Sequence, residues 1–506
     1  MRILFLSMAP LRQGPSGATS DFASARYRVL IPATHLARRG HAVQVMSLRP
    51  GEPPPEALDA QADVAIFAKS FSPSNERLAA HLRSRGIRVI VDYCDDHFEH
   101  PEHGAHFRRM AELATDVVAS TQVLADSIRR HTGREASVIT DPVEGPRGTP
   151  RFEPKLPALR VVWFGHPTNL VSVIDKAGDL KALAQRMPVQ FTLVTQRDPS
   201  AESLASGIAA LLPDRLQVQL LPWSLEGTWK VLQECDLVWI PVANEEGKMA
   251  KSPNRLLESM WAGRLVVADR MPAYEPFDDL MPLGQGLELG VAKALADPRG
   301  VEARLREAQR RIARHHSGFE CGRLWARACG DDSTLPLKLN LGCGDKILPG
   351  YVNVDVVEAR AGMKPDVVCD LHDLAPFSDD SAEEILSVHV VEHFWRWEVR
   401  DVLREWVRVL KPGGRMIVEC PNILSACEAL LANPREAAQE DERGQRSMWV
   451  LYGDPKWKDP LMIHRWGYTP ESLRELMAQA GLRDVRQEPA QFKLREPRDM
   501  RIVGVK

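Results

Sequence analysis

The chain has 506 residues, of which 44% are hydrophobic and 26% are charged, as is ordinary for a soluble globular protein. A length of this size predicts about three domains. The formal net charge of −3 gives no basic footprint, so binding to nucleic acid or to an anionic membrane surface is not expected.

No stretch approaches about 18 uninterrupted apolar residues, so the sequence predicts no transmembrane segment. The opening residues, Met1 to Ser7, are too short for a signal-peptide core and are better interpreted as a buried strand. The eight cysteines are scattered and include no Cys-x-x-Cys pair, which argues against a disulfide framework or a structural zinc site. We therefore expect a cytoplasmic protein, and the sequence predicts no particular oligomeric state.

Strand and helix patterns alternate in the first part of the chain. The runs typical of buried strands are Ile3–Ser7, His41–Met46, Val64–Ala68 and Arg88–Asp92. Between the first two, Ser24–Gly40 has the apolar spacing of a helix, with Gly40 as a natural stop. This alternation predicts a parallel sheet covered by helices on both faces, here over residues 1–150.

Four charged residues of this first domain have more than one interpretation. Arg26 and Arg28 are expected to be solvated charges on the helix, which is the usual place for arginine. Asp95 and Asp96 follow a strand and are interpreted either as loop residues or as a wall that faces an acceptor. The sequence does not choose between these two interpretations.

Residues 141–157 are rich in proline and glycine and predict a linker. The strand pattern restarts after it, at Arg160–Gly165, Val189–Val194, Leu216–Leu220, Leu237–Ile240 and Leu265–Ala268. We therefore expect a second doubly wound domain over residues 151–330. Two such domains in succession are typical of a two-lobed enzyme with a cleft between its lobes.

The second domain contains a loop, a helix and a strand that suit an anionic ligand. Ser252 is expected to cap the helix, with Pro253 at its first position. The backbone N–H groups of the helix start then point at the cleft, with Lys251 beside them. Glu258 lies about one and a half turns further on, within reach of the sugar hydroxyls of a nucleotide.

This element resembles the donor-binding element of retaining, family 4-like glycosyltransferases, which have two Rossmann-like lobes (the GT-B fold). The resemblance implies a nucleotide-sugar as donor substrate and a glycan or glycolipid as acceptor. It also implies that Gly165, at the end of a strand, approaches a phosphate or a sugar. In the first domain it implies that Gly17 and Ser24–Arg28 occupy the place that receives the acceptor and the diphosphate, which is the alternative to solvated charges at Arg26 and Arg28. The family carries two glutamates separated by seven residues: Glu258 matches the second, whereas Ala250 stands in the place of the first.

A third domain is expected over residues 331–506, and its first strands carry the strongest motif of the chain. One apolar run ends in Gly342-Cys343-Gly344, and the next ends in Asp355. The glycines let the backbone pass close to a ligand, and a carboxylate at the tip of the next strand can accept from both hydroxyls of a ribose.

The order of motifs after Asp355 resembles the class I S-adenosylmethionine-dependent methyltransferases, especially those that act on small hydroxylated acceptors. The resemblance covers roughly Leu335 to Lys506 and implies S-adenosylmethionine as the cofactor, bound by Gly342, Gly344 and Asp355, with Asp370 and Leu371 beside the adenine. It also implies a seven-stranded, Rossmann-like sheet whose last strand is antiparallel. The expected strands are Lys338–Leu341, Tyr351–Asp355, Asp366–Cys369, Ile385–Val388, Arg415–Glu419, a segment near Asp484–Glu488, and Met500–Val505.

The segment His389-Val-Val-Glu392-His393 matches the His-x-x-Glu-His signature of some zinc proteases. That signature needs a helix, whereas here it begins at the end of a strand, so we favour a role in acceptor binding and proton removal. His389 would then sit where the fourth strand ends at the active site. His393 and His464 are the candidate bases.

A metal-dependent alternative stays open for the same histidines. Some small-acceptor and RNA-end methyltransferases carry a similar Glu-x-x-Glu-His, with a later histidine, and hold a divalent ion against the hydroxyls of the acceptor. Here His389 replaces the first glutamate, and His464 would supply the later histidine. We assign no metal ligand from the sequence and expect the histidines to act as simple bases.

Taken together, the sequence predicts a bifunctional enzyme: a GT-B glycosyltransferase fused to an S-adenosylmethionine-dependent O-methyltransferase. Its expected task is to add a sugar and to methylate a sugar hydroxyl in the biosynthesis of a polysaccharide or glycoconjugate. The alternative is a methyltransferase whose two-lobed part binds glycan without catalysis, which the missing glutamate at Ala250 favours and which Lys251, Ser252 and Glu258 oppose.

Overall fold

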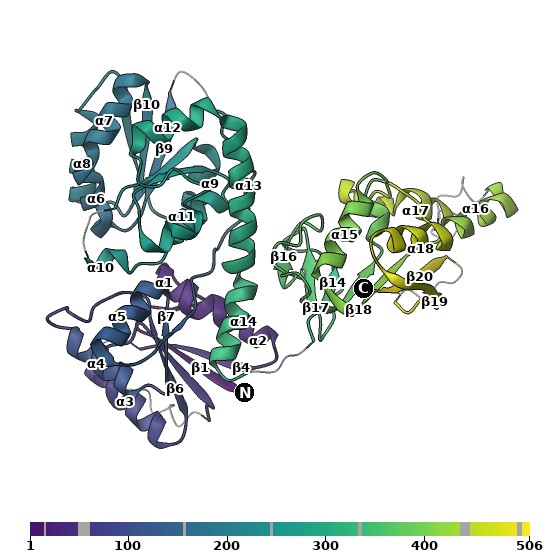
Figure 1. The fold of residues 1–506 in the computed structure, drawn as a ribbon, viewed down its shortest axis with the longest axis horizontal. Helices are drawn as coiled ribbons and strands as arrows, with labels where there is room; N and C mark the ends of the chain where they lie inside the picture. The colour runs from purple at the N-terminus through teal and green to yellow at the C-terminus, as the bar shows by residue number, and fades with distance from the viewer. Residues whose placement is uncertain are drawn as a thin grey trace. The chain divides into compact units, whose positions relative to one another are not determined.

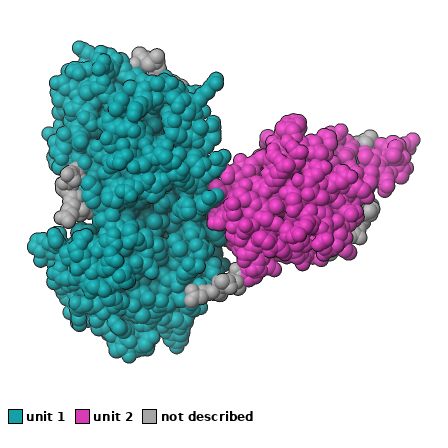
Figure 2. All heavy atoms as spheres, in the orientation of Figure 1, with its two compact units in different colours: residues 1–332 teal, residues 333–506 magenta. Residues whose placement is uncertain are grey.

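The computed structural model describes residues 1–14, 17–48, 61–154, 158–242, 246–331, 336–435, 446–492 and 498–506. The chain divides into two compact units, Met1–Asp332 (unit 1) and Ser333–Lys506 (unit 2), which are coloured separately in Figure 2. Within the described ranges, no helix combines the length and the apolar character needed to cross a membrane.

The first lobe of unit 1 is built on a six-stranded parallel sheet with the order β4-β1-β5-β6-β7-β8. Its strands are β1 (Arg2–Ser7), β4 (Ala42–Ser47), β5 (Val64–Ala68), β6 (Arg88–Tyr93), β7 (Asp116–Ala119) and β8 (Ser137–Val138), and a small hairpin is formed by β2 (Arg12–Gly14) and β3 (Gly17–Thr19). Its helices are α1 (Ala23–Ala25), η1 (Arg26–Leu30), α2 (Ile31–Arg38), α3 (Pro73–Ser84), α4 (Gly104–Leu113) and α5 (Gln122–Thr132).

Alternating residues of each strand supply the two faces of this sheet. Leu4 and Leu6 of β1 join the core under α3, α4 and α5, whereas Ile3 and Phe5 join the core under α2 (Figure 1). Both faces are therefore buried, as expected for a parallel sheet with helices on each side.

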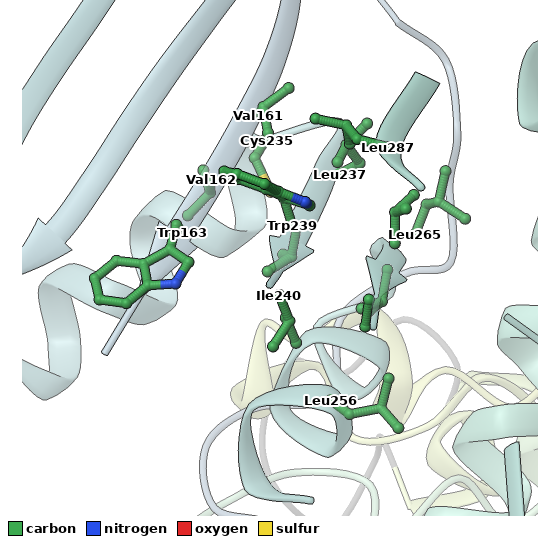
Figure 3. Close-up of a cluster of buried hydrophobic side chains, with 14 of the residues drawn as sticks. Val161, Val162, Trp163, Cys235, Leu237, Trp239, Ile240, Leu256, Leu265 and Leu287 are labelled. Atoms are coloured by element: carbon green, nitrogen blue, oxygen red, sulfur yellow. The ribbon is translucent and has the colours of Figure 1, made fainter. Parts of the chain in front are cut away.

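The second lobe of unit 1 contains a five-stranded parallel sheet with the order β11-β10-β9-β12-β13. Its strands are β9 (Leu159–Phe164), β10 (Val189–Thr195), β11 (Leu216–Pro222), β12 (Leu237–Ile240) and β13 (Leu265–Ala268). Its helices are η3 (Pro167–Asn169), α6 (Leu170–Asp175), α7 (Ala177–Arg186), α8 (Pro199–Ala209), α9 (Leu225–Glu234), α10 (Glu246–Met249), α11 (Asn254–Trp261), η4 (Pro272–Phe277), α12 (Leu287–Ala296) and α13 (Pro298–His315). Figure 3 shows part of its core, with Val161, Leu237 and Leu265 on three strands and Leu256 on α11 in the same hydrophobic cluster.

The chain returns to the first lobe after α13. Helix α14 (Gly318–Ala328) packs beside α2, and its Trp325 is fully buried against the first sheet, with its ring 6.0 Å from that of Phe5. This helix falls within the range 151–330 expected for the second domain, yet its side chains complete the core of the first. The three domain ranges drawn from the sequence stay predictions.

From Gly145 to Phe152, the segment expected to be a linker packs against the second lobe. Phe152 is buried in the core of that lobe, and a Cβ atom at Gly145 would collide with the Trp229 ring. The proline and glycine residues here therefore permit close packing and do not mark a loose tether.

The helix expected over Ser24–Gly40 is interrupted by a wider turn. Residues Arg26–Leu30 form the π-helical segment η1, in which the Ile31 N–H donates to the Arg26 carbonyl five residues earlier. Pro32 follows and has no N–H to donate to the Arg28 carbonyl, which removes one α-helical bond at this place. Such wide turns are frequent at functional sites.

Unit 2 has a single seven-stranded sheet with the order β16-β15-β14-β17-β18-β20-β19, in which β20 is antiparallel to its neighbours. Its strands are β14 (Lys338–Leu341), β15 (Val352–Asp355), β16 (Val367–Val368), β17 (Ala382–Val388), β18 (Leu410–Pro421), β19 (Arg483–Glu488) and β20 (Asp499–Val505). Its helices are η5 (Val391–His393), α15 (Val399–Val409), α16 (Ile423–Ala432), α17 (Arg446–Tyr452), η7 (Pro455–Trp457), η8 (Pro460–Met462) and α18 (Pro470–Gln479). The predicted fold class, two doubly wound lobes followed by a seven-stranded sheet, is confirmed.

Candidate functional sites in the two units

Helix α11 begins one residue later than the sequence predicts. Pro253 is its N-cap and no side chain caps the first turn, so the prediction that Ser252 caps a helix starting at Pro253 is wrong. The first helical bond runs from the Leu257 N–H to the Pro253 carbonyl at 3.0 Å. The helix start is tied instead to the segment between the lobes, because the Asn254 amide donates to the Asp141 carboxylate at 2.8 Å.

Lys251 stands beside an acidic residue of the first lobe. Burial raises the pKa of Asp95, but the Lys69 ammonium at 2.7 Å and the charge of Lys251 outweigh it and lower that pKa overall. Lys69, which the sequence analysis missed, adopts a left-handed backbone with φ of 51°, rare for a residue with a side chain. Asp95 thus belongs to a charged cluster with one lysine from each lobe, and Ser252 is partly exposed next to it.

Ala250 is not part of this charged cluster and packs in the core of the first lobe. It is 2% exposed, and its carbonyl accepts the Thr121 hydroxyl at 2.8 Å. The position where the resembling family carries its first glutamate is therefore occupied by a small residue that anchors one lobe on the other.

Glu258 of α11 accepts a short hydrogen bond from the hydroxyl of Tyr27 in η1. Burial raises the pKa of Glu258 to about 7, with a further rise from nearby Glu144, whereas Tyr27 and Arg26 act in the opposite direction. Burial also raises the pKa of the Tyr27 phenol, which keeps it a donor. Glu258 is thus held by the first lobe and changes its charge near neutral pH.

Arg26 and Arg28 are not solvated, and that expectation is wrong. Arg28 is 1% exposed and donates to both carboxylate oxygens of Asp92, at 2.5 and 3.0 Å, and to Asp141 at 3.0 Å. Arg26 is 9% exposed and pairs with Glu144 at 2.8 Å. The turn of η1 lets successive side chains reach different acids, and these partners lie more than sixty residues away in the sequence.

Gly165 follows β9 and lies beside an arginine that the sequence analysis missed. A Cβ at Gly165 would stand 3.2 Å from the Trp163 ring and 3.7 Å from Nη1 of Arg255, in the first turn of α11. That Nη1 is buried and has no hydrogen-bond partner among the described residues. A buried guanidinium donor next to a glycine turn fits an anionic group.

In unit 2, the glycine turn after β14 and the acid after β15 come together as predicted from their strands. Gly342 has φ of 69°, and a Cβ there would collide with Val390. Asp355 is 7% exposed, and its two oxygens accept the Gly344 N–H at 2.7 Å and the Val357 N–H at 3.1 Å. Each oxygen keeps a further lone pair for a ligand hydroxyl, so these residues fit the ribose of an adenosyl cofactor.

Asp370 and Leu371 lie on the turn after β16 and face different surroundings. The Asp370 side chain is 57% exposed and accepts from Nδ1 of His372 at 2.8 Å, and this bond raises the pKa of His372. Leu371 is buried, and its carbonyl accepts the indole N–H of Trp406 at 2.9 Å. The placement of both beside an adenine ring stays a prediction.

His389 directly follows β17, in a left-handed backbone conformation with φ of 57°. Its Nδ1 lies 3.2 Å from Glu392 and its Nε2 lies 3.3 Å from Asp499, whose side chain is fully buried at the start of β20. Burial raises the pKa of Asp499, but His389 and then Arg498 lower it overall. His389 therefore bridges two acids, and Asp499 is a residue that no local motif indicates.

The structure brings His393 and His464 together, with their rings 5.0 Å apart. His393 Nδ1 lies 3.1 Å from the Ile463 carbonyl, and His464 Nδ1 lies 2.8 Å from the Val450 carbonyl. A carbonyl only accepts, so each Nδ1 carries the proton and each Nε2 keeps a free lone pair. Burial, followed by the charge of nearby His464, lowers the pKa of His393, although Glu392 raises it.

Glu392 completes this cluster from the same short turn, η5. It is 2% exposed, and one oxygen lies 3.9 Å from Nε2 of His464. Burial raises its pKa, but His389 followed by the other two histidines outweighs that effect and lowers the pKa to about 2. The segment His389–His393 is a strand end followed by a 3-10 turn, not the α-helix that the zinc-protease signature requires.

The seven-stranded sheet with its glycine turn and neighbouring acid gives unit 2 a Rossmann-like fold of the kind that methyltransferases have. In agreement, residues 349–418 match a family model described as a methyltransferase domain (Methyltransf_11). A domain of this family implies S-adenosylmethionine as the methyl donor. No curated protein sequence matches the chain significantly.

Solved structures similar to the chain fall into two groups. HepE of Anabaena in complex with UDP-glucose is 14% identical, with a TM-score of 0.47, and covers 65% of this chain and 100% of its own. OtsA without ligand is 11% identical, with a TM-score of 0.44, and covers 65% of this chain and 99% of its own. A SAM-dependent methyltransferase from Archaeoglobus fulgidus is 19% identical, with a TM-score of 0.24, and covers 36% of this chain and 92% of its own.

Proposed function

We propose that the protein is a bifunctional enzyme that transfers a sugar from a nucleotide-sugar and methylates a sugar hydroxyl of a glycan or glycoconjugate. The observation that carries the proposal is the pairing, in one chain, of a unit that matches a methyltransferase model with a two-lobed unit whose residues at the start of α11 suit a nucleoside diphosphate. The cytoplasmic location and the role in polysaccharide biosynthesis belong to the same proposal.

The donor site is proposed around the start of α11. Arg255 supplies a buried donor that has no hydrogen-bond partner among the described residues, and Gly165 leaves room beside it for a phosphate. Lys251 and Ser252 line the same helix start, and Glu258 is placed to accept hydroxyls once the bond from Tyr27 opens. These groups match the charge pattern of a nucleotide-sugar: two phosphates followed by a polyol.

The methylation site is proposed at the carboxyl ends of β14, β15 and β17. S-adenosylmethionine would lie against Gly342, Gly344 and Asp355, and it supplies an electrophilic methyl group when bound. His393 and His464 would face the acceptor with free Nε2 lone pairs and act on its hydroxyl. His389 holds Glu392 in position and is the third proposed catalytic residue.

The second candidate function is a methyltransferase with a two-lobed module that binds glycan without catalysis. The specific observation in its favour is Ala250, which faces the core of the first lobe where the resembling transferases present a glutamate. Incubation of the full chain with UDP- and GDP-sugars separates the two functions. Release of free nucleotide supports the bifunctional enzyme, whereas saturable binding of glycan without turnover of any donor supports the module.

Arg255→Met is expected to weaken binding of the accepted nucleotide-sugar by about 10- to 100-fold, because a charged hydrogen bond contributes about 1.5–3 kcal/mol. Its thermal stability should be unchanged or higher, since one buried nitrogen of the guanidinium has no hydrogen-bond partner in the described part of the chain. Calorimetric titration and thermal unfolding measure the two effects. Arg270→Met is the matched control, because Arg270 is an exposed surface residue of the same lobe. Equal affinities in the two variants would contradict the assignment.

The affinity for a nucleotide-sugar is expected to rise as the pH increases from 6 to 8. The pKa of Glu258 is raised to about 7, so below that pH the carboxyl is protonated and accepts hydroxyls poorly. The diphosphate of a nucleotide-sugar is esterified at both ends and does not titrate in this range. Glu258→Gln should remove the pH dependence, and a slope that persists in that variant would assign it to another group.

A further inference from the structure

We propose that Glu392, His393 and His464 bind a divalent transition-metal ion that holds the acceptor hydroxyls for methyl transfer. Each of these residues offers one ligand atom, and the three ligand atoms lie within 4.8 Å of one another. No other group of three or more metal-binding side chains among the described residues comes this close together. The inference rests on the methyltransferase part of the proposed function and specifies how its acceptor is held.

The orientation of the two histidines suits a metal. The Nδ1 atoms of His393 and His464 are occupied by the backbone carbonyls of Ile463 and Val450. Protein metal sites use this arrangement, in which the second ring nitrogen bonds to a backbone oxygen and thereby fixes the tautomer and the ring orientation. The Nε2 lone pairs are then the atoms left for the ion.

The third ligand, Glu392, is a buried carboxylate whose nearest partner is the His389 ring. Both oxygens of Glu392 are shielded from solvent and have no hydrogen-bond partner among the described residues, although His389 Nδ1 lies 3.2 Å away. A buried anion in this condition is costly unless a cation neutralises it. His389, itself held by Asp499 at 3.3 Å, would orient Glu392 behind the ion.

The geometry leaves open positions on the ion. Ligand atoms about 2.1 Å from a tetrahedral zinc lie about 3.4 Å apart, so the three side chains need to close by about 1 Å. Three protein ligands with open positions are typical of catalytic metal sites, and two imidazoles favour zinc, cobalt or manganese over magnesium. Two adjacent hydroxyls of a sugar ring can fill those positions.

The surroundings agree with a sugar as the acceptor. Trp395, two residues after His393, is 41% exposed, and Trp466, two residues after His464, is 46% exposed. The guanidinium of Arg465 lies 5.2 Å from the centre of the Trp395 ring. The Trp395 ring also stacks on that of Trp397, with ring centres 4.8 Å apart, so its faces are already in use. The indole of Trp466 is therefore the apolar surface proposed for the C–H face of a sugar, while the ion would hold its hydroxyls.

The metal would act by lowering the pKa of a bound hydroxyl. As the acceptor oxygen attacks, the new O–CH₃ bond forms while the S–CH₃ bond of the sulfonium breaks. The positive sulfonium becomes a neutral thioether, and the proton of the hydroxyl passes to solvent water. His393 and His464 would then act as ligands rather than as bases.

Titration of the full chain with Co²⁺, after treatment with a chelator, tests the site without reference to activity. We expect visible absorption bands of a cobalt ion bound by nitrogen and oxygen, which Zn²⁺ displaces. His464→Ala and Glu392→Gln should each lower the affinity for Co²⁺ at least about tenfold. Both variants should still bind S-adenosylmethionine, which shows that unit 2 is folded.

The histidine-rich segment of the first lobe provides the matched control. His97, His100 and His103 lie close together there, with ring centres 4.5 to 6.4 Å apart. His100→Ala should leave the cobalt bands unchanged. Bands that survive in His464→Ala but vanish in His100→Ala would overturn the proposal, as would a chain that binds no Co²⁺.

Two further outcomes separate this inference from the proposed function. Full methylation of a glycan by chelated enzyme would overturn the metal site and leave the function standing. Metal binding that depends on His464, in a protein that methylates no glycan, would support the site and overturn the proposed acceptor.

Discussion

Replacement of Asp355 by alanine is expected to weaken the binding of S-adenosylmethionine by about 10- to 100-fold or more. Its carboxylate is proposed to accept the ribose hydroxyls, and each charged hydrogen bond contributes about 1.5–3 kcal/mol. The same carboxylate holds the Gly344 and Val357 N–H groups, so its loss also loosens the glycine turn. Calorimetric titration of the full chain measures the change.

Glu383→Ala is the control for this prediction. Glu383 lies near the start of β17, at the end of the sheet opposite to the cofactor, and its ion pair with Lys411 is exposed. The control should bind the cofactor as the wild type does, and unit 1 should keep its unfolding transition in both variants. An Asp355→Ala variant with undiminished affinity would refute the cofactor assignment.

Replacement of Arg28 by methionine is expected to destabilise unit 1 by about 3–5 kcal/mol. Removal of one partner leaves the carboxylates of Asp92 and Asp141 buried without their cation, which is the costly way to break a buried ion pair. Urea unfolding followed by fluorescence measures the loss. Arg2→Met, which breaks the exposed pair with Asp63, is the control and should cost no more than about 1 kcal/mol.

The destabilisation by Arg28→Met should also depend on pH. Burial already raises the pKa of Asp92, and Arg28 is the main group that lowers it, so the variant raises that pKa further. A carboxyl whose pKa is raised in the folded state is tolerated at low pH, where it is protonated, and costs free energy as the pH rises. The difference from wild type should therefore be smaller at pH 5 than at pH 8, and a constant difference would count against the buried pair.

The parts of the fold that could be predicted from the sequence are those that depend on residues close together in the chain. The strands that end in Gly342 and Asp355 are short apolar runs closed by a glycine turn and an acid, and parallel pairing then brings their ends together. The sequence places the start of the helix near Ser252 to within one residue. The remaining difference of one residue arises because proline is acceptable both before and at the first helical position.

The contacts that could not be predicted join residues far apart in the chain. Tyr27 and Glu258 are separated by 231 residues, and Arg28 and Asp141 by 113. Nothing near Arg28 in the sequence indicates burial, since arginine is normally solvated and its acidic partners come from other elements. The direction in which Ala250 points is likewise set by how α10 and α11 meet the first lobe, and no local spacing reveals it.

The histidines lie between these two cases. His389 and His393 stand in one recognisable segment, and their position after a strand indicated an active site. Their partners Asp499 and His464 come from separate segments, so the bridge from Asp499 through His389 to Glu392 appears only in the structure.

The most direct test of the account is a product analysis of the full chain supplied with S-adenosylmethionine, a panel of nucleotide-sugars and a panel of glycan acceptors. Mass spectrometry should find one product that carries both an added sugar and an added methyl group. In the Arg255→Met variant the sugar should be lost, and in Asp355→Ala the methyl group should be lost. Methylated glycan without any added sugar, from every donor tested, would contradict the bifunctional enzyme.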